Sequence, residues 1–86
     1  MVYRLLLKPR AKRDLDKLPA EAWSRVHNAI MGLAADPRPD RCRKLRGGAY
    51  RIRVIRYRVI YDVDDGSRTV TILRAGHRRD VCRRLT

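Results

Sequence analysis

The chain has 86 residues, of which 44% are apolar, and its formal net charge is +13. This length and apolar content support one small hydrophobic core, so a single domain spanning residues 1–86 is expected. No apolar stretch has the length of a membrane span or the layout of a signal peptide, which favours a cytoplasmic protein and argues against a membrane partner.

The first half of the chain predicts a strand followed by a helical hairpin. Residues 2–7, VYRLLL, are rich in β-formers and predict a strand. Pro9 is suited to the opening of a first helix, which the Leu18-Pro19 pair ends. A second helix is expected over residues 20–34. Its apolar stripe, which by default faces the core, consists of Trp23, Val26, Ile30 and Leu33.

The second half predicts an antiparallel sheet. Residues 50–54 and 57–61 alternate between apolar and mostly basic side chains, which is the pattern of a hairpin with one buried face. The tyrosines at positions 50, 57 and 61 fall on the apolar side. Residues 62–68, DVDDGSR, are typical of a turn, and residues 69–76 predict a further strand. The tail 77–86 is expected to add either a short helical turn or a last strand. The whole order predicts an α+β fold.

The positive charge is concentrated in the second half, with a net +3 in residues 1–40 and +10 in residues 41–86. Arginine supplies 18 of the 22 basic residues, and its planar guanidinium binds phosphate through two hydrogen bonds at once. A two-residue hairpin loop would place Arg53 opposite Arg58 and Arg51 diagonally near, although like charges in such positions destabilise a sheet. A well-solvated surface also explains this pattern, but a rigid cationic face is typical of a nucleic-acid site.

The cysteines give no sign of a metal centre. Cys42 and Cys82 lack CxxC or Cys/His ligand spacing, and two thiols in a reducing compartment are more often free than bridged. We therefore expect no zinc, no disulfide and no cofactor.

Residues 44–85, KLRGGAYRIRVIRYRVIYDVDDGSRTVTILRAGHRRDVCRRL, resemble the second half of RelE-type toxins of the RelE/ParE toxin–antitoxin superfamily. The most specific segments are YRIRVIRYRVIY and ILRAGHRRDV, and the similarity extends over nearly the whole chain. The resemblance implies the RelE-like fold and an mRNA interferase that cuts the codon in the ribosomal A site. In that metal-independent reaction the ribose 2′-OH attacks the adjacent phosphate, which requires a base, stabilising cations and an acid.

The resemblance also implies which residues act. Arg51 and Arg53 match basic residues, often lysines, on the second strand of RelE relatives. Arg58 matches the arginine of the family's YR pair, and Arg78 matches an arginine near the C-terminus. Because a guanidinium keeps its proton, all four are expected to bind phosphate and to stabilise the transition state rather than to act as bases.

His77 and Cys82 complete the candidate catalytic set. An imidazole accepts and returns a proton near neutral pH, although His77 could equally follow the Gly76 turn and contact solvent or a partner. Cys82 stands where RelE-like toxins commonly have an aromatic residue, usually tyrosine, which implies weakened nuclease activity. Its arginine neighbours favour a reactive thiolate, while the alternative is a small apolar side chain packed under the sheet.

Further basic side chains are expected to contact RNA or the ribosome without sequence preference. These are Lys44 and Arg46, on the loop before the sheet, together with Arg56, Arg79, Arg83 and Arg84.

The partners implied by the resemblance are the ribosome with its mRNA and a cognate antitoxin, through which operator DNA is bound. A concentrated basic face suits such an acidic or wrapping partner. Two alternatives remain open. A ParE-like toxin shares the fold but poisons DNA gyrase by binding, without nuclease chemistry, and a catalytically weakened RelE homologue would only bind its antitoxin.

Overall fold

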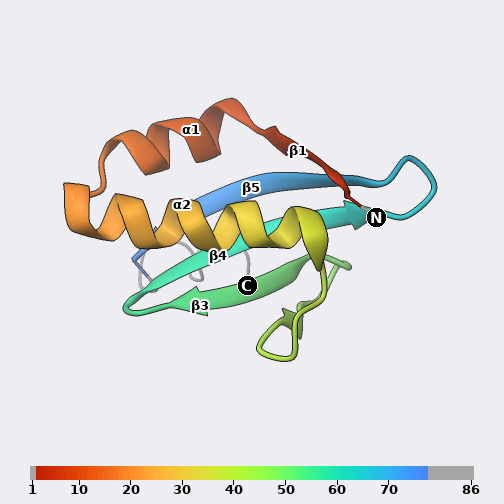
Figure 1. Ribbon diagram of the computed structural model, residues 1–86. Coiled ribbons are helices and arrows are strands. Elements are labelled where there is room, and N and C mark those ends of the chain that lie inside the picture. Colours follow the sequence, from red (N-terminus) through yellow and green to blue (C-terminus); the bar gives the residue numbers. More distant parts are fainter. Residues whose placement is uncertain (1, 78–86) are drawn as a thin grey trace.

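A five-stranded mixed sheet and two helices make up the computed structural model, which describes residues 2–77 (Figure 1). The sheet order is β1-β5-β4-β3-β2, with β1 parallel to β5 and every other pair antiparallel. The elements are β1 (Arg4–Leu7), α1 (Pro9–Asp16), α2 (Ala20–Ala35), β2 (Arg43–Lys44), β3 (Tyr50–Val54), β4 (Tyr57–Asp64) and β5 (Thr69–His77). The predicted α+β fold is confirmed, whereas the two-residue strand β2 was not expected.

Helix α2 crosses one face of the sheet (Figure 1), and the core lies between this face and the two helices, with Ala11 and Leu15 contributed by α1. Val26, Ile30 and Leu33 of α2 are buried there against the apolar side chains of β3, β4 and β5. The prediction that Trp23 belongs to this stripe is wrong, because 42% of Trp23 is exposed and the neighbouring Ala22 is buried. The Trp23 ring instead stacks on His27 along the helix, with centroids 4.6 Å apart.

Helix α1 closes the edge of β5 where β1 ends. β1 pairs only with residues 69–72 of β5, so the backbone N–H of Ala75 has no strand partner on that side. The Asp14 carboxylate of α1 accepts this N–H at 3.1 Å and the Arg74 Nε at 2.7 Å. Both charged side chains are largely buried. This junction attaches the helical hairpin to the strand that ends at His77.

A register shift in β5 changes which side chains face the helices. Ile60 pairs with Arg74 and Tyr61 pairs with Ile72, so Leu73 is the extra residue of a β-bulge. Before the bulge Val70 and Ile72 face the core, and after it Ala75 is the core residue and His77 lies on the same face. A bulge of one residue inverts the alternation that a regular strand would keep.

A polar cluster fixes the connection between α2 and the sheet. Arg38 donates two hydrogen bonds to Asp65, at 2.8 and 3.1 Å, and its Nε donates to the Tyr50 hydroxyl at 3.0 Å. The Tyr3 hydroxyl also donates to Asp65, at 2.7 Å. These bonds from Arg38, followed by the bond from Tyr3, lower the pKa of Asp65. The cluster joins the chain start, β3 and the β4–β5 turn.

Tyr61 provides a test of the core. Its side chain is fully buried and its hydroxyl donates to the Pro37 carbonyl at 2.7 Å. Burial, and secondarily Cys42, raise the phenol pKa, so the folded state keeps this proton at a pH where the unfolded state has lost it. The contribution of this proton to the free energy of unfolding is therefore fully present below about pH 10 and is lost as the pH rises further.

Tyr61→Phe is therefore expected to cost about 1 kcal/mol at neutral pH and to flatten the alkaline decline in the free energy of unfolding. Urea denaturation between about pH 8 and pH 11 measures both effects. Tyr57→Phe, at the partly buried end of the sheet, is the matched control. Identical alkaline profiles for Tyr61→Phe and the unmodified chain would contradict this account of Tyr61.

Neither helix in residues 2–77 is long and apolar enough to cross a membrane.

Candidate nucleic-acid interface

Four arginines occupy neighbouring positions on the sheet face that points away from the core. The predicted register is confirmed, since Arg53 lies directly opposite Arg58. Arg51 pairs with Ile60 on one side and with Arg43 of β2 on the other. Directly paired residues project from the same face of a sheet. We call these four residues, Arg43, Arg51, Arg53 and Arg58, the arginine face.

The arginine face combines rigid anchoring with access to solvent. Arg51 and Arg58 are half-buried, so their stems lie along the sheet, while Arg43 and Arg53 are exposed. Ile60, beside Arg51, is fully buried although it lies on this face and outside the main core cluster. Guanidiniums held on paired strands present planar donors at fixed spacing, which suits the nonbridging oxygens of a phosphate.

Arg43 was not among the predicted site residues. A strand of two residues is too short to show an alternation, so periodicity could not reveal it. The Gly47-Gly48 pair was the available signal, because both glycines adopt positive φ, at 87° and 96°, in the turn between β2 and β3. A tight turn before a basic strand indicates that the preceding residues pair back onto it.

The other basic residues predicted to contact RNA lie at different places. Lys44 lies in β2 rather than on a loop and pairs with Tyr50, so it projects from the helix-bearing face. Arg46 is exposed in the turn between β2 and β3. Arg56 is exposed in the β3–β4 loop, and one residue pair, Val54–Tyr57, lies between this loop and the Arg53–Arg58 pair. The register thus brings Arg56 close to the arginine face and directs Lys44 away from it.

His77 ends β5 on the opposite face from Arg58. It pairs with Tyr57, and the two rings meet edge to face with centroids 6.2 Å apart. Arg58 pairs with Gly76 instead. The bulge at Leu73 produces this placement, because a regular strand would turn residue 77 to the side that carries Thr69 and Thr71. The register therefore separates the imidazole from the arginine face.

The remaining candidates lie outside the described residues. These are Arg78, Arg79, Cys82, Arg83 and Arg84. Cys42 is a free thiol, half-buried against the core. Within residues 2–77 no three His, Cys, Asp or Glu side chains are grouped so that they could hold a metal ion.

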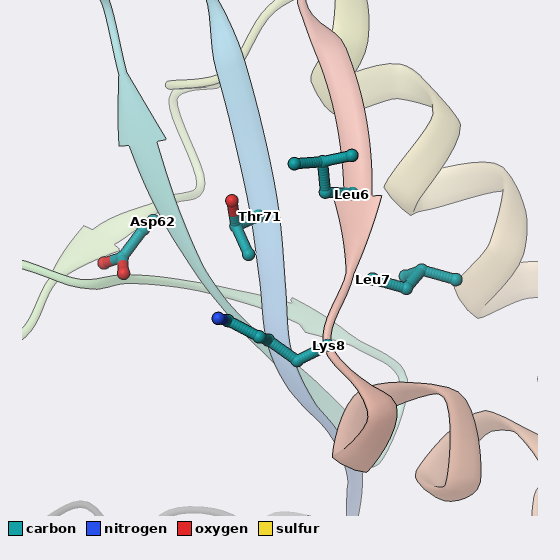
Figure 2. Close-up of a pocket in the computed structure, with 5 residues that line it drawn as sticks. All are labelled: Leu6, Leu7, Lys8, Asp62 and Thr71. Atoms are coloured by element: carbon teal, nitrogen blue, oxygen red, sulfur yellow. The ribbon is translucent and has the colours of Figure 1, made fainter.

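A pocket of about 440 Å³ opens at the other end of the sheet. Figure 2 shows its lining, with Lys8 extending from the end of β1 across β5 toward the side where Asp62 lies. Leu6, Leu7 and Thr71 complete the wall. Asp62 follows Arg58 by four residues, about 13 Å along an extended strand. The pocket combines one acid, one lysine and one threonine with two leucines, so it does not share the chemistry of the arginine face.

Comparison with known proteins identifies the family. Residues 5–81 match the family model described as the ParE toxin of the type II toxin–antitoxin system parDE. The chain belongs to the RelE/ParE superfamily of toxins. Toxin RelG of Mycobacterium tuberculosis is 36% identical over 89 residues, covering 98% of this chain and all of RelG.

Solved structures of RelE proteins share the fold. The toxin–antitoxin complex RelBE2 from M. tuberculosis contains a chain that is 34% identical, with a TM-score of 0.80, covering 91% of this chain and 100% of that one. The RelE–RelB complex of Pyrococcus horikoshii gives 29% identity and a TM-score of 0.81, with coverage of 91% and 97%. A double mutant of the E. coli toxin RelE in the free state gives 26% identity and a TM-score of 0.79, with coverage of 94% and 88%. The resemblance seen in the sequence is confirmed at the level of the superfamily.

Proposed function

We propose that this RelE/ParE toxin is a ribosome-dependent mRNA interferase that cleaves mRNA in the A site. The observation that carries the proposal is the arginine face, where Arg53 lies directly opposite Arg58 and Arg43 and Arg51 continue the cluster. Like charges in such positions weaken a sheet. The phosphates of a polyanionic ligand would neutralise that repulsion, and they would hydrogen-bond to the same closely spaced guanidiniums.

The reaction that fits this face is transfer within the RNA strand. The 2′-oxygen forms a bond to the adjacent phosphorus, and the bond from phosphorus to the 5′-oxygen breaks. A base takes the 2′-OH proton, the leaving oxygen gains a proton, and the products are a cyclic phosphate and a free 5′-OH. Arginines stabilise the negative charge that builds on the phosphoryl oxygens, and this electrostatic role needs no change in their protonation.

Roles follow from placement. We assign phosphate binding and transition-state stabilisation to Arg51, Arg53 and Arg58, with Arg43 and Arg56 as flanking phosphate contacts. Arg46 is proposed to contact ribosomal RNA. The face of His77 argues against direct proton transfer by this residue, so we assign it no step.

An antitoxin is the proposed regulatory partner. The relatives from M. tuberculosis and P. horikoshii were solved as toxin–antitoxin complexes. A chain with a net charge of +13 favours a partner that covers its basic face with carboxylates. Operator DNA would then be bound through the antitoxin, and the toxin would act in the cytoplasm, where ribosomes are found.

A ParE-like activity is the second candidate, favoured by the family model that matches residues 5–81. Such a toxin poisons DNA gyrase by binding, and in that case the arginine face would be a docking surface without chemistry.

Pulse labelling in cells separates the two candidates. Within the first minutes after induction of the toxin, we expect incorporation of labelled methionine to fall while incorporation of thymidine continues. An early loss of thymidine incorporation with broken DNA, and sustained methionine incorporation, would instead establish the gyrase poison.

A further inference from the structure

The loop at the tip of the β3–β4 hairpin has an unusual residue at a demanding position. Val54 pairs with Tyr57, so Ile55 and Arg56 alone make the connection. Ile55 has a φ of 57°. Two-residue hairpin loops demand such backbone angles because they match the strand twist, and glycine, asparagine or aspartate normally supplies them. A β-branched residue is the poorest choice, since its Cβ collides with the backbone in this region.

Ile55 is also unfavourable in its contact with water. Half of its surface, 51%, is exposed, so its side chain gains little from burial in the fold. Single exposed apolar residues are ordinary on protein surfaces, but they normally occupy relaxed backbone positions. Ile55 combines a strained backbone φ with an exposed apolar side chain, and neither feature adds to the stability of the folded protein. An external contact of the side chain explains both.

The surroundings of Ile55 indicate the chemistry of that contact. Arg53 and Arg58 form the last outward-facing pair before the loop, and Arg56 is the adjacent exposed residue. An apolar protein surface placed here would desolvate these guanidiniums without replacing their hydrogen bonds. RNA satisfies both groups, because its phosphates pair with the arginines and its bases offer apolar faces to the isoleucine.

We propose that Ile55 is a wedge that contacts the nucleobase beside the phosphate bound by Arg53 and Arg58 and unstacks it from its neighbour. Apolar side chains of this size, inserted between bases, are a known means of distorting a nucleic acid. The inference rests on the proposed RNA substrate. Attack by a 2′-oxygen requires it to stand in line with the leaving 5′-oxygen, and a stacked strand does not hold that geometry. Ile55 is thus a positioning residue that exchanges no proton.

The test uses a short single-stranded RNA that carries one 2-aminopurine, whose fluorescence rises when it is unstacked. Binding of the unmodified protein is expected to raise the fluorescence at saturation. Ile55→Gly and Ile55→Asn are compared with it at saturating protein, with saturation checked by anisotropy, because the arginines and their counterion release still allow the RNA to bind. Both variants should leave the fluorescence near that of free RNA. Ile55→Val, which keeps the branched apolar side chain, should restore the rise.

Three further tests support the interpretation. Ile55→Asn should raise the melting temperature by about 4 °C, because asparagine tolerates positive φ, so lost unstacking cannot be attributed to unfolding. Met31→Ala, at another exposed apolar residue, on α2, should change neither the anisotropy nor the 2-aminopurine fluorescence. On programmed ribosomes, Ile55→Gly should slow single-turnover cleavage about tenfold.

The outcomes separate this inference from the proposed function. Equal fluorescence for the unmodified protein and Ile55→Gly, or no rise at all, overturns the wedge even if mRNA is cleaved. A rise that depends on Ile55 supports the wedge even if ribosomes show no cleavage, which would overturn only the interferase. If Ile55→Gly binds an antitoxin more weakly than the unmodified protein does, but gives the same fluorescence with RNA as the unmodified protein, the hairpin tip is a protein contact. That result would overturn the proposal.

Discussion

Arg58→Ala is expected to lower the rate of A-site cleavage about 100-fold or more and to abolish growth arrest, since one preorganised donor to a developing oxyanion contributes on this scale. Arg58 lies opposite Arg53 on β4 and is half-buried, so part of its side chain lies against the sheet. The measurements are single-turnover cleavage on programmed ribosomes and colony formation after induction.

Three further variants define what the loss means. Arg58→Lys keeps the charge but not the planar pair of donors, so it should recover only part of the rate. Arg25→Ala removes the same charge from the exposed surface of α2 and should leave the rate unchanged. His77→Ala should cost far less than Arg58→Ala, because His77 pairs with Tyr57 on the other face. Full toxicity of Arg58→Ala would count decisively against the proposed reaction.

Asp14→Ala is expected to be the most destabilising single substitution at a polar residue in the described chain, costing about 3 kcal/mol. Asp14 accepts hydrogen bonds from Arg74 and from the Ala75 backbone. Without it, a largely buried guanidinium and an edge N–H lose their acceptor, and the melting temperature should fall by at least about 10 °C.

Asp16→Ala supplies the control for that measurement. Asp16 ends the same helix two residues later and is exposed, so its removal changes the charge equally and should shift the melting temperature by only about 1–2 °C. Similar shifts for the two variants would show that the junction between α1 and β5 contributes no more than surface charge.

Local patterns in the sequence predicted the elements that local physics determines. Alternation located β3 and β4, and the two-residue loop placed Arg53 against Arg58. Proline bounded the helices, with α1 beginning at Pro9 and α2 at Ala20. The first strand was predicted two residues too long. Its parallel pairing with β5 could not be predicted, because alternation shows that a strand has a buried face but not which strand lies beside it.

The site was less predictable because its geometry depends on a non-local detail. The bulge at Leu73 directs His77 toward Tyr57, and no residue near it in the sequence marks a bulge. The prediction that Trp23 is buried was wrong for a related reason. Helical spacing groups Trp23 with Val26 and Ile30, but burial depends on where the helix crosses the sheet. Arg43 was missed because β2 is only two residues long.

Mapping of cleavage ends by primer extension on mRNA held in ribosomes tests the central claim most directly. The same mRNA without ribosomes and a gyrase supercoiling assay are run beside it, with Arg58→Ala as the inactive control. The proposed function predicts cuts within the A-site codon that require both ribosomes and Arg58, with unaffected gyrase. Intact mRNA together with inhibited supercoiling would contradict it and would make the arginine face a binding surface for gyrase.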